Sequence, residues 1–367
     1  MKIRELTTKS FRNLSDLTLT VDPGINVLYG NNAQGKTNLM EALWLFTGNR
    51  SFRGAKESEM IAFGEKNAKL GVQFDCGGRE QTARLMLGDG KKHDLNGVLL
   101  KSASELIGRY YAVVFSPSDL SFVKDGPEKR RRFLDTAIAQ LKPVYQNYLV
   151  QYNRVLLQRN SLLKDLVYHP DLEATVDLWD LQLAKLGTIL TSFRMDYLTK
   201  LNGFAREIYR GISRETEEVA FLYRSTVFPE EAIRYTDEAI SRYEEALKES
   251  RREDQQVGST SVGVHRDDIE ITINGVNARQ FGSQGQQRSC VLALKLAESE
   301  LLHHVTGETP VILLDDVMSE LDPERQDYIL NHLEDQQVFI TCCDPSNPLR
   351  LKSGSIFEVK DGQVTLR

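Results

Sequence analysis

Residues 30–37, which read GNNAQGKT, contain the residue types that bind the phosphates of a nucleotide. The pattern G-x-x-x-x-G-K-[ST] follows an apolar run at 25–29 and precedes apolar residues at helical spacing in 38–45. Glycines allow a close approach to the ligand, so backbone N–H groups at the start of the helix can point at phosphate oxygens. We expect Lys36 to reach the β- and γ-phosphates and the Thr37 hydroxyl to ligate Mg²⁺.

Two carboxylates, Asp315 and Asp316, follow four apolar residues at 311–314. In an α/β sheet, ligands collect at the carboxyl ends of the strands, where these side chains would lie. We assign Asp315 to Mg²⁺, directly or through water, and Asp316 to polarising the attacking water. About three quarters of the chain separates Lys36 from Asp315, far more than in a compact single-domain GTPase.

The segments around these carboxylates resemble ABC-type ATPases. Residues 281–287, FGSQGQQ, are similar to the signature written LSGGQ in that superfamily, and residues 319–322, SELD, are similar to its D-loop. A serine hydroxyl and glycine N–H groups at a helix start, here expected from Gln287 onward, can hold a γ-phosphate. In ABC-type heads the signature of one subunit caps the nucleotide of the other, so the resemblance implies an ATP-dependent homodimer.

The pattern of elements predicts how these residues are positioned. Strands are predicted at 3–13, 17–21, 25–29, 68–74 and 82–87, with a hairpin turn at Asn96-Gly97. Residues 127–250 carry helical periodicity, divided by Pro143 and by His169-Pro170, with a strand at 219–223 and a further helix at 230–250. After 257 we expect a strand at 268–273, a turn at Asn274-Gly275, a returning strand at 276–281, a helix at 292–302 and a strand at 310–314. These elements predict an α/β fold with an inserted helical lobe at 126–255. The resemblance implies that 1–125 and 256–367 form an ABC-type P-loop head with mixed sheets.

Composition describes an ordinary globular protein of 367 residues, with 41% hydrophobic and 27% charged residues. No apolar run approaches the roughly 20 residues needed to span a bilayer, and MKIRELTTKSFRN lacks the apolar core of a secretion signal. We therefore expect a cytoplasmic protein. The four cysteines, Cys76, Cys290, Cys342 and Cys343, show no metal-ligand spacing, so reduced thiols are expected.

Six segments together resemble the RecF family, bacterial DNA replication and repair proteins related to the SMC-type ATPases. They are SFRNLSDLTL, GNNAQGKTNLMEALW, VVFSPSDLSFVKDGPEKRRRFLD, GVHRDDIEITING, FGSQGQQRS and LLDDVMSELD. The resemblance implies an ATP-dependent homodimer that clamps DNA, acting in recombinational repair of single-strand gaps and helping RecA load with RecR and RecO. It also implies roles in DNA replication and the SOS response.

The resemblance carries over to particular positions. Arg12 and Asn13 match residues that approach the nucleotide in SMC-like heads, while Asn32 and Gln34 lie within the loop and are expected to touch phosphate or hold its shape. The full set of predicted nucleotide-binding residues is Arg12, Asn13, Gly30, Asn31, Asn32, Ala33, Gln34, Gly35, Lys36, Thr37, Asn38, Ser283, Gly285 and Gln286. Lys36, Asp315 and Asp316 are the predicted catalytic residues, and Thr37 and Asp315 the predicted Mg²⁺ ligands.

Three positions depart from the wider ABC pattern. No Q-loop glutamine is evident at 113–119, and Cys342 or Cys343 stands where a switch histidine is expected. A thiol cannot do the hydrogen bonding or proton work of imidazole at neutral pH. Asp316 also replaces the commoner Glu. We therefore predict slow ATP hydrolysis that times dimer dissociation.

The sequence shows no single DNA-reading element. The net charge is −6, so phosphate contacts require a local basic surface. Residues 129–132, KRRR, form the densest basic run, but successive helical positions point in different directions, and at least one is expected to pair with Glu128 or Asp135. Individual surface candidates are Arg50, Arg53, Lys56 and Lys101. His265, beside Asp267 and Asp268, is expected to be a structural cluster rather than a metal site.

Two other functions compete with a DNA clamp. An ABC transporter ATPase subunit would need a coupling surface for membrane domains, and the helical insertion and missing Q-loop and switch residues argue against it. A structural scaffold that binds ATP without hydrolysing it remains open from the residues alone.

Overall fold

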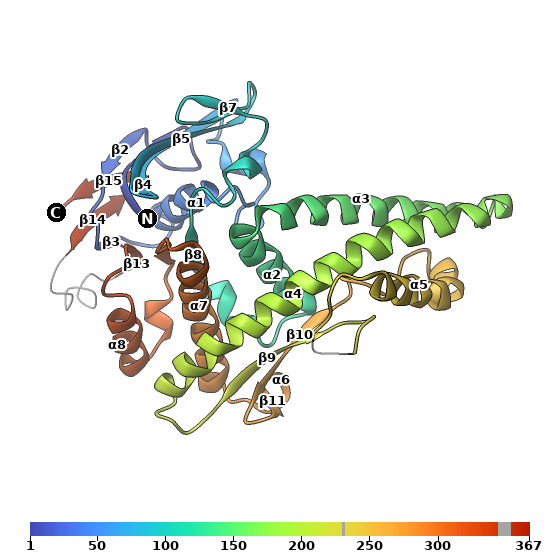
Figure 1. The fold of residues 1–367 in the computed structure, drawn as a ribbon. Helices are drawn as coiled ribbons and strands as arrows, with labels where there is room; N and C mark the ends of the chain where they lie inside the picture. The colour runs from blue at the N-terminus through green and yellow to red at the C-terminus, as the bar shows by residue number, and fades with distance from the viewer. Residues whose placement is uncertain (230–231, 344–353) are drawn as a thin grey trace. The chain divides into compact units, whose positions relative to one another are not determined.

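The computed structural model describes residues 1–229, 232–343 and 354–367, and its elements form two compact units (Figure 1). The first unit contains Met1–Ser121 and Glu298–Arg367, and the second contains Phe122–Ala297. The functional division into a head, 1–125 and 256–367, and a helical lobe, 126–255, stays a prediction. Within the described residues, no helix combines the length and apolar character needed to cross a membrane.

The first unit contains a six-stranded antiparallel sheet in the order β2-β1-β4-β5-β6-β7. Its strands are β1 (Lys2–Lys9), β2 (Leu17–Thr20), β4 (Asn67–Cys76), β5 (Arg79–Gly88), β6 (Lys92–Leu95) and β7 (Val98–Leu100). Buried and more exposed side chains alternate along β4 and β5, which is typical of a sheet with one face on a core. The strand predicted at 3–13 is too long: β1 ends at Lys9, since Ser10 and Arg12 adopt left-handed φ values of 51° and 53°.

A second six-stranded sheet in this unit has the order β15-β14-β3-β13-β12-β8. Its strands are β3 (Ile25–Tyr29), β8 (Ala112–Phe115), β12 (Val311–Leu314), β13 (Val338–Cys342), β14 (Ser355–Lys360) and β15 (Gln363–Leu366). All neighbours are parallel except β14 and β15. The central strands are apolar nearly throughout because parallel sheets are buried on both faces. Their carboxyl ends lie at one edge, so β3, β13 and β12 deliver the residues that follow them to the same place.

Helix α1 (Lys36–Leu45) begins directly after the glycine-rich loop and is buried on all sides from Leu39 to Leu45. A helix without a solvent-facing stripe must be covered on more than one face. The other helical elements of the first unit are η1 (Glu57–Met60), η2 (Ala103–Leu106), η3 (Pro117–Ser121), η5 (Met318–Glu320) and α8 (Pro323–His332). Burial of α1 fixes the helix whose first turn carries the phosphate-binding residues.

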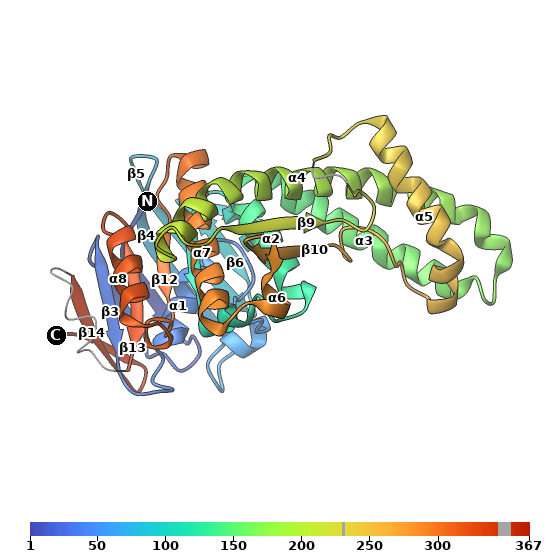
Figure 2. The same cartoon turned by 90° about the horizontal axis from the view of Figure 1, so that it is seen from below.

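The second unit is built on long helices and a three-stranded sheet in the order β11-β10-β9. Its elements are α2 (Pro127–Leu141), α3 (Pro143–Asp165), η4 (Pro170–Thr175), α4 (Val176–Ile212), β9 (Val219–Arg224), α5 (Asp237–Val257), β10 (Asp268–Ile273), β11 (Val276–Asn277) and α6 (Ala278–Phe281), together with the first part of α7 (Gln284–Thr306). Figures 1 and 2 both show α3 lying alongside α4. Pro143 starts α3, as predicted, because proline suits the first helical turn.

Two predicted elements of this unit are wrong in part. The returning strand at 276–281 is only two residues long, since the Asn277 side chain accepts hydrogen bonds from the N–H groups of Arg279 and Gln280 and starts α6. The helix predicted at 230–250 begins at Asp237, where Thr236 is the N-cap, and continues to Val257. Residues 230 and 231 lie outside the described part of the chain.

Candidate functional site

The glycine-rich loop connects β3 to α1, as predicted, and both of its glycines are required by geometry. Gly30 has a φ of 155°, and a Cβ there would lie 2.2 Å from the carbonyl oxygen of Val359. Gly35 has a φ of 115°, and a Cβ would lie 2.9 Å from Leu14 Cδ2. At Gly30 a side chain would clash with backbone, and at Gly35 the positive φ would strain any residue with a Cβ, so the loop conformation favours glycine at both ends.

The Lys36 ammonium is held inside the loop. Its Nζ donates to the carbonyl oxygens of Gly30, at 2.6 Å, and Asn31, at 2.9 Å. The side chain is almost fully buried, and its Nζ lies 3.9 Å from Cys343 Sγ. The positive charge is therefore concentrated where the loop N–H groups can receive an anion.

Thr37 and Asp315, which are 278 positions apart, are directly bonded: Thr37 Oγ1 donates to Asp315 Oδ1 at 2.9 Å. Thr341 Oγ1, from β13, donates to the same oxygen at 3.0 Å. Burial raises the pKa of Asp315, whereas these two hydrogen bonds oppose the rise. A hydroxyl beside a buried carboxylate provides the hard oxygen donors that Mg²⁺ prefers, so these residues fit the ion.

Asp316 has the left-handed backbone conformation, with a φ of 55°. Its N–H donates to Thr341 Oγ1 at 2.8 Å, and its carbonyl oxygen accepts from Ser319 Oγ at 2.9 Å. Asp and Asn adopt this conformation more readily than other residues with a Cβ. The geometry therefore supplies a physical reason for Asp rather than the longer Glu at this position.

The other predicted loop residues hold the loop in shape. Asn13 Nδ2 donates to the Ala33 carbonyl oxygen at 3.1 Å, and Asn38 Nδ2 donates to Asn13 Oδ1 at 2.6 Å. Gln34 Oε1 accepts from the N–H of Asp361, at 2.6 Å, in the turn between β14 and β15. These contacts pre-form the loop before any ligand binds.

Arg12 lies beside the loop helix, where it pairs with a residue that the sequence reasoning missed. Its Nε and Nη2 donate to the Glu41 carboxylate at 2.8 and 3.0 Å. Glu41 is the charged residue within the apolar run NLMEALWL, and Thr341 is the hydroxyl within FITCC. Each of these two polar residues lies in an otherwise apolar segment, and a buried polar group requires a hydrogen-bonding partner. This pattern is the sequence signal that could have identified Glu41 and Thr341.

The positions that depart from the ABC pattern can now be placed. Cys343, rather than the buried Cys342, lies at the loop, and its Sγ donates to Asn32 Oδ1 at 3.1 Å. At the end of β8, Ser116 is bonded to Asp119 at 2.9 Å. The segment 113–119 contains no glutamine, and its polar side chains at the end of β8 include Ser116 and Asp119, which are hydrogen-bonded to each other.

The predicted signature residues Ser283, Gly285 and Gln286 belong to the second compact unit. Ser283 Oγ accepts from the Gln286 N–H at 3.2 Å, and Gln286 Oε1 accepts from the Ser283 N–H at 2.8 Å. This reciprocal pair is a capping box at the start of α7. The helix therefore begins at Gln284 and not at Gln287, the start assumed from the sequence.

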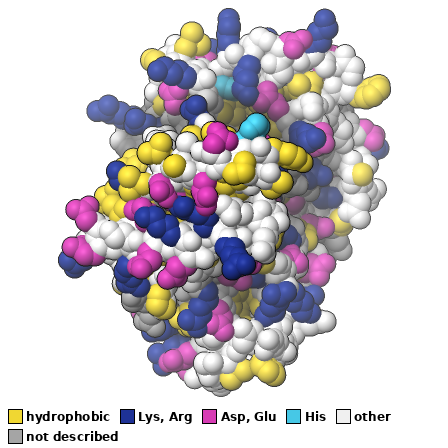
Figure 3. Space-filling view, turned by 90° about the vertical axis from the view of Figure 1, so that its right-hand side faces the viewer, with side chains coloured by type: hydrophobic (Ala, Val, Ile, Leu, Met, Phe, Trp, Pro, Cys, Tyr) yellow, Lys and Arg dark blue, Asp and Glu magenta, His cyan; other side chains and the backbone are white. Residues whose placement is uncertain are grey.

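The basic run at 129–132 is largely used within the second unit. Arg130 is buried and bidentate with Asp268, at 2.6 and 2.9 Å, and Arg131 donates to the Asp267 carbonyl oxygen at 2.8 Å. Arg132 pairs with Glu128, one of the two predicted partners. The other predicted partner, Asp135, pairs instead with Arg194 at 2.8 Å. On the face drawn in Figure 3, basic and acidic side chains are intermixed, so that view shows no continuous basic surface.

His265 is partly buried in the second unit. Its Nδ1 lies 2.9 Å from Tyr152 Oη, and its Nε2 lies 2.9 Å from the Thr260 carbonyl oxygen. A neutral imidazole that donates from Nε2 and accepts at Nδ1 satisfies both contacts. Burial lowers the pKa of His265 to about 4. The contacts are those of a structural residue.

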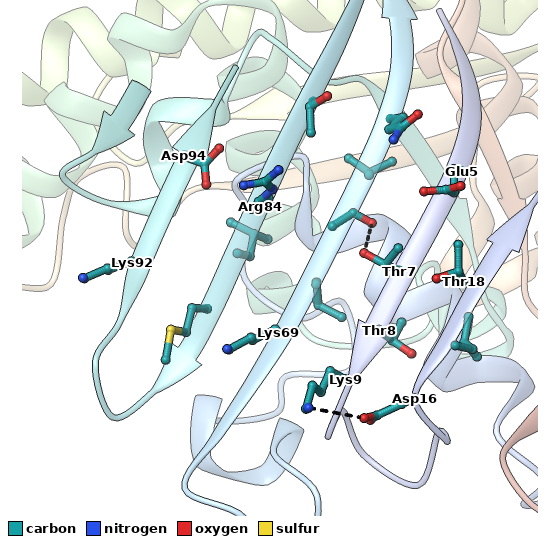
Figure 4. A pocket seen from close by; sticks show the side chains of 18 residues that line it. Glu5, Thr7, Thr8, Lys9, Asp16, Thr18, Lys69, Arg84, Lys92 and Asp94 are labelled. Carbon is teal, nitrogen blue, oxygen red and sulfur yellow. Dashed lines mark hydrogen bonds and ion pairs between the residues drawn. The ribbon is translucent and has the colours of Figure 1, made fainter. Parts of the chain in front are cut away.

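A hollow of about 670 Å³ lies on the open face of the antiparallel sheet (Figure 4). Its charged lining residues are Lys9, Lys69, Arg84, Lys92, Glu5, Asp16 and Asp94. The two signs nearly balance, and Lys9 pairs with Asp16 at 3.7 Å. None of the phosphate-loop residues line this hollow, so it is separate from the candidate nucleotide site.

Comparison with known proteins points to one family. Residues 2–351 match the model of the RecF/RecN/SMC N terminal domain. The chain is 39% identical to the DNA replication and repair protein RecF of Agathobacter rectalis over 368 residues, covering 99% of both chains. It is also 39% identical to that of Heliobacterium modesticaldum over 372 residues, covering 100% of this chain and 99% of the relative.

Solved structures agree with this relationship. A structure described as the recombination mediator protein RecF-ATP in the RecFOR pathway has a TM-score of 0.92 and 37% identity, covering 100% of this chain and 97% of the other. The Smc head domain from Pyrococcus furiosus has a TM-score of 0.56 at 15% identity, covering 100% of this chain and 96% of the other. The latter likeness concerns the fold alone and supports the predicted α/β ABC-type head.

Proposed function

The chain belongs to the RecF family of DNA replication and repair proteins, and from this membership we propose that it is an ATP-dependent DNA-binding protein of recombinational repair. In this proposal, an ATP-bound homodimer clamps DNA at gaps and assists RecA loading together with RecR and RecO. Slow hydrolysis releases the dimer, and the same activity serves replication and the SOS response. The observation that supports the proposal most is the Thr37–Asp315 bond, which assembles a nucleotide site from distant parts of the sequence.

The nucleotide site divides into binding and reacting parts. The loop N–H groups and Lys36 hold the phosphates, as their positions at the start of α1 favour. Thr37 and Asp315 would hold Mg²⁺, and the bound ion would neutralise charge on the phosphates. Asp316 orients the attacking water from the end of β12. Its fixed left-handed backbone, bonded to Thr341, keeps the carboxylate in one place.

The proposed dimer uses the signature residues in trans. Ser283 and Gln286 cap α7, so the first N–H groups of that helix stay at an ordered terminus where a phosphate can bind. A γ-phosphate held there joins two copies of the chain. ADP lacks that group and holds the copies together less tightly.

Slow turnover follows from the residues around the phosphate loop. Cys343, which lies beside Lys36, replaces the imidazole that would assist proton transfer. Asp316 is also shorter than Glu and must act from a constrained backbone. Hydrolysis therefore acts as a timer for the clamped state.

Light scattering with ATP, ADP and no nucleotide, each with and without DNA, tests the proposal. Lys36→Arg should weaken ATP-driven dimerisation because the planar guanidinium cannot occupy the same narrow pocket of carbonyls. Asp316→Asn should prolong the dimer, since Asn tolerates the left-handed conformation but is uncharged. Unchanged dimer lifetimes in both variants would eliminate gating by hydrolysis and leave the ATP-binding scaffold.

DNA binding is measured separately by fluorescence anisotropy over a range of salt concentrations. Phosphate contacts predict an affinity that falls steeply with salt, because binding releases counterions. A salt-independent signal, or equal binding with ATP and without nucleotide, would contradict the ATP-dependent clamp.

A further inference from the structure

A buried carboxylate inside the phosphate-loop helix organises the polar groups around it. Glu41 is 0% exposed. It accepts from Arg12 Nε and Nη2 at 2.8 and 3.0 Å and from Ser51 Oγ, and its Oε2 lies 3.8 Å from Arg53 Nη1. A buried charge is costly unless it is paired and hydrogen-bonded. The two arginines therefore share a single negative group as their anchor.

The position of Glu41 connects this anchor to the candidate Mg²⁺ ligands. Glu41 follows Thr37 by four residues in α1, so the two side chains lie one above the other on the same side of the helix. Thr37 is bonded to Asp315. The rigid first turns of α1 thus fix both guanidinium groups relative to the carboxylate at the end of β12.

A chain of hydrogen bonds also joins Arg53 to the phosphate loop. Arg53 Nη1 donates to Asn38 Oδ1 at 2.8 Å, and Asn38 Nδ2 donates to Asn13 Oδ1 at 2.6 Å. Asn13 Nδ2 in turn donates to the Ala33 carbonyl oxygen at 3.1 Å. These bonds fix the position of the Arg53 guanidinium relative to the phosphate loop.

The two arginine side chains differ in exposure and in how closely they contact Glu41. The Arg12 side chain is 16% exposed and bidentate, whereas that of Arg53 is 42% exposed and makes a longer contact with Glu41. Arg53 Nη1 is bonded to Asn38 at 2.8 Å, and Asn38 directly follows Thr37 in α1. The half-exposed Arg53 guanidinium therefore lies at the first turns of α1, which carry Thr37.

We propose that Glu41 is a positioning residue that holds Arg12 and Arg53 beside the phosphate loop so that the site distinguishes ATP from ADP. The inference rests on the proposed ATP-dependent function. The loop N–H groups and Lys36 bind phosphates of either nucleotide, and Lys36 is held by the carbonyl oxygens of Gly30 and Asn31 rather than by Glu41. The additional negative charge of ATP lies toward Thr37 and Asp315, where a correctly placed Arg53 is most favourable.

Calorimetric titration of Glu41→Gln with Mg²⁺-ATP and Mg²⁺-ADP tests the role. We expect the preference for ATP over ADP to fall about fivefold or more, while ADP affinity changes by less than about twofold. Glu41→Asp, which keeps the charge, should restore part of the preference. Arg53→Gln should reproduce the loss, and combining it with Glu41→Gln should add little, because both act through one contact.

The matched control is Asp254→Asn in the second unit, where Asp254 is buried and pairs with Arg159 at 2.7 Å. It should lower the melting temperature without changing the nucleotide preference.

If Glu41→Gln does not fold, Arg53→Gln tests the proposal in its place, since that variant leaves Glu41 paired with Arg12. A normal ATP preference in the folded Glu41→Gln protein, or in Arg53→Gln when Glu41→Gln does not fold, overturns the inference. Wild-type protein that does not prefer ATP also overturns the inference, whereas failure of ATP to drive dimerisation in light scattering would overturn the proposed function.

Discussion

Buried polar residues determine much of the behaviour of individual sites in this chain. His265 in the second unit is partly buried, and both of its ring nitrogens are occupied by uncharged partners, Tyr152 and Thr260. Arg131 and Arg266 add positive charge nearby and further disfavour the imidazolium. The folded protein therefore holds this side chain neutral at pH values where it would be protonated in the unfolded chain.

Stability should fall on acidification through His265. Its pKa drops from an ordinary 6.5 to about 4 on folding. Between these values the unfolded state binds more protons, so the contribution is complete above about pH 6.5 and is lost as the pH falls toward 4. The free energy of unfolding should fall by about 3 kcal/mol through this histidine.

Urea denaturation at several pH values checks this by comparing wild type with His265→Gln. The difference in unfolding free energy between the two proteins isolates the contribution of His265, because all other titratable groups are present in both. Wild type should lose about 3 kcal/mol more than the variant between pH 7 and 4. Parallel stability curves would show that His265 does not titrate with folding.

At the scale of elements, helix termini serve both structure and the proposed ligand binding. Gly35 precedes α1 with a φ that only glycine adopts readily, whereas Ser283 and Gln286 cap α7 by exchanging hydrogen bonds. A mutation at either terminus can thus change folding as well as nucleotide binding. The two effects need separate measurement.

Ser283→Ala should destabilise the protein even without nucleotide. Loss of the N-cap hydroxyl should lower the free energy of unfolding by about 1 kcal/mol. Ser283→Asn keeps a capping oxygen and should retain most of the stability. Denaturant unfolding without nucleotide measures the effect of each variant on stability. ATP-driven dimerisation of the two variants measures the effect on nucleotide binding. An Ala variant as stable as wild type would show that the cap contributes nothing.

At the scale of the molecule, the described residues form two compact units. The nucleotide site described above lies in the first unit, whereas the second contains its own buried ionic network of Arg159, Asp180 and Asp254. Ligand bound at the phosphate loop should therefore protect the two units to different degrees. This distinction is measurable without knowing how the units are arranged.

Saturating Mg²⁺-ATP should slow hydrogen exchange most in β3, α1 and β12. A ligand at about 100 times its Kd stabilises the bound state by about 2.7 kcal/mol. The effect should be absent in Lys36→Ala, which removes the ammonium from the loop. Equal protection of α3 and α4 under conditions that keep the protein monomeric would contradict a site confined to the first unit.

The sequence alone determined the phosphate loop, the paired aspartates, the family and most elements, because these depend on short-range patterns. Glycine spacing, apolar runs and turn residues act over a few positions and leave local signals. Only the tertiary structure placed Thr341 on Asp315, Glu41 between two arginines, Cys343 beside Lys36 and Arg130 on Asp268. These partners come from segments far apart along the chain, and polar side chains become committed to one another only when folding removes them from water.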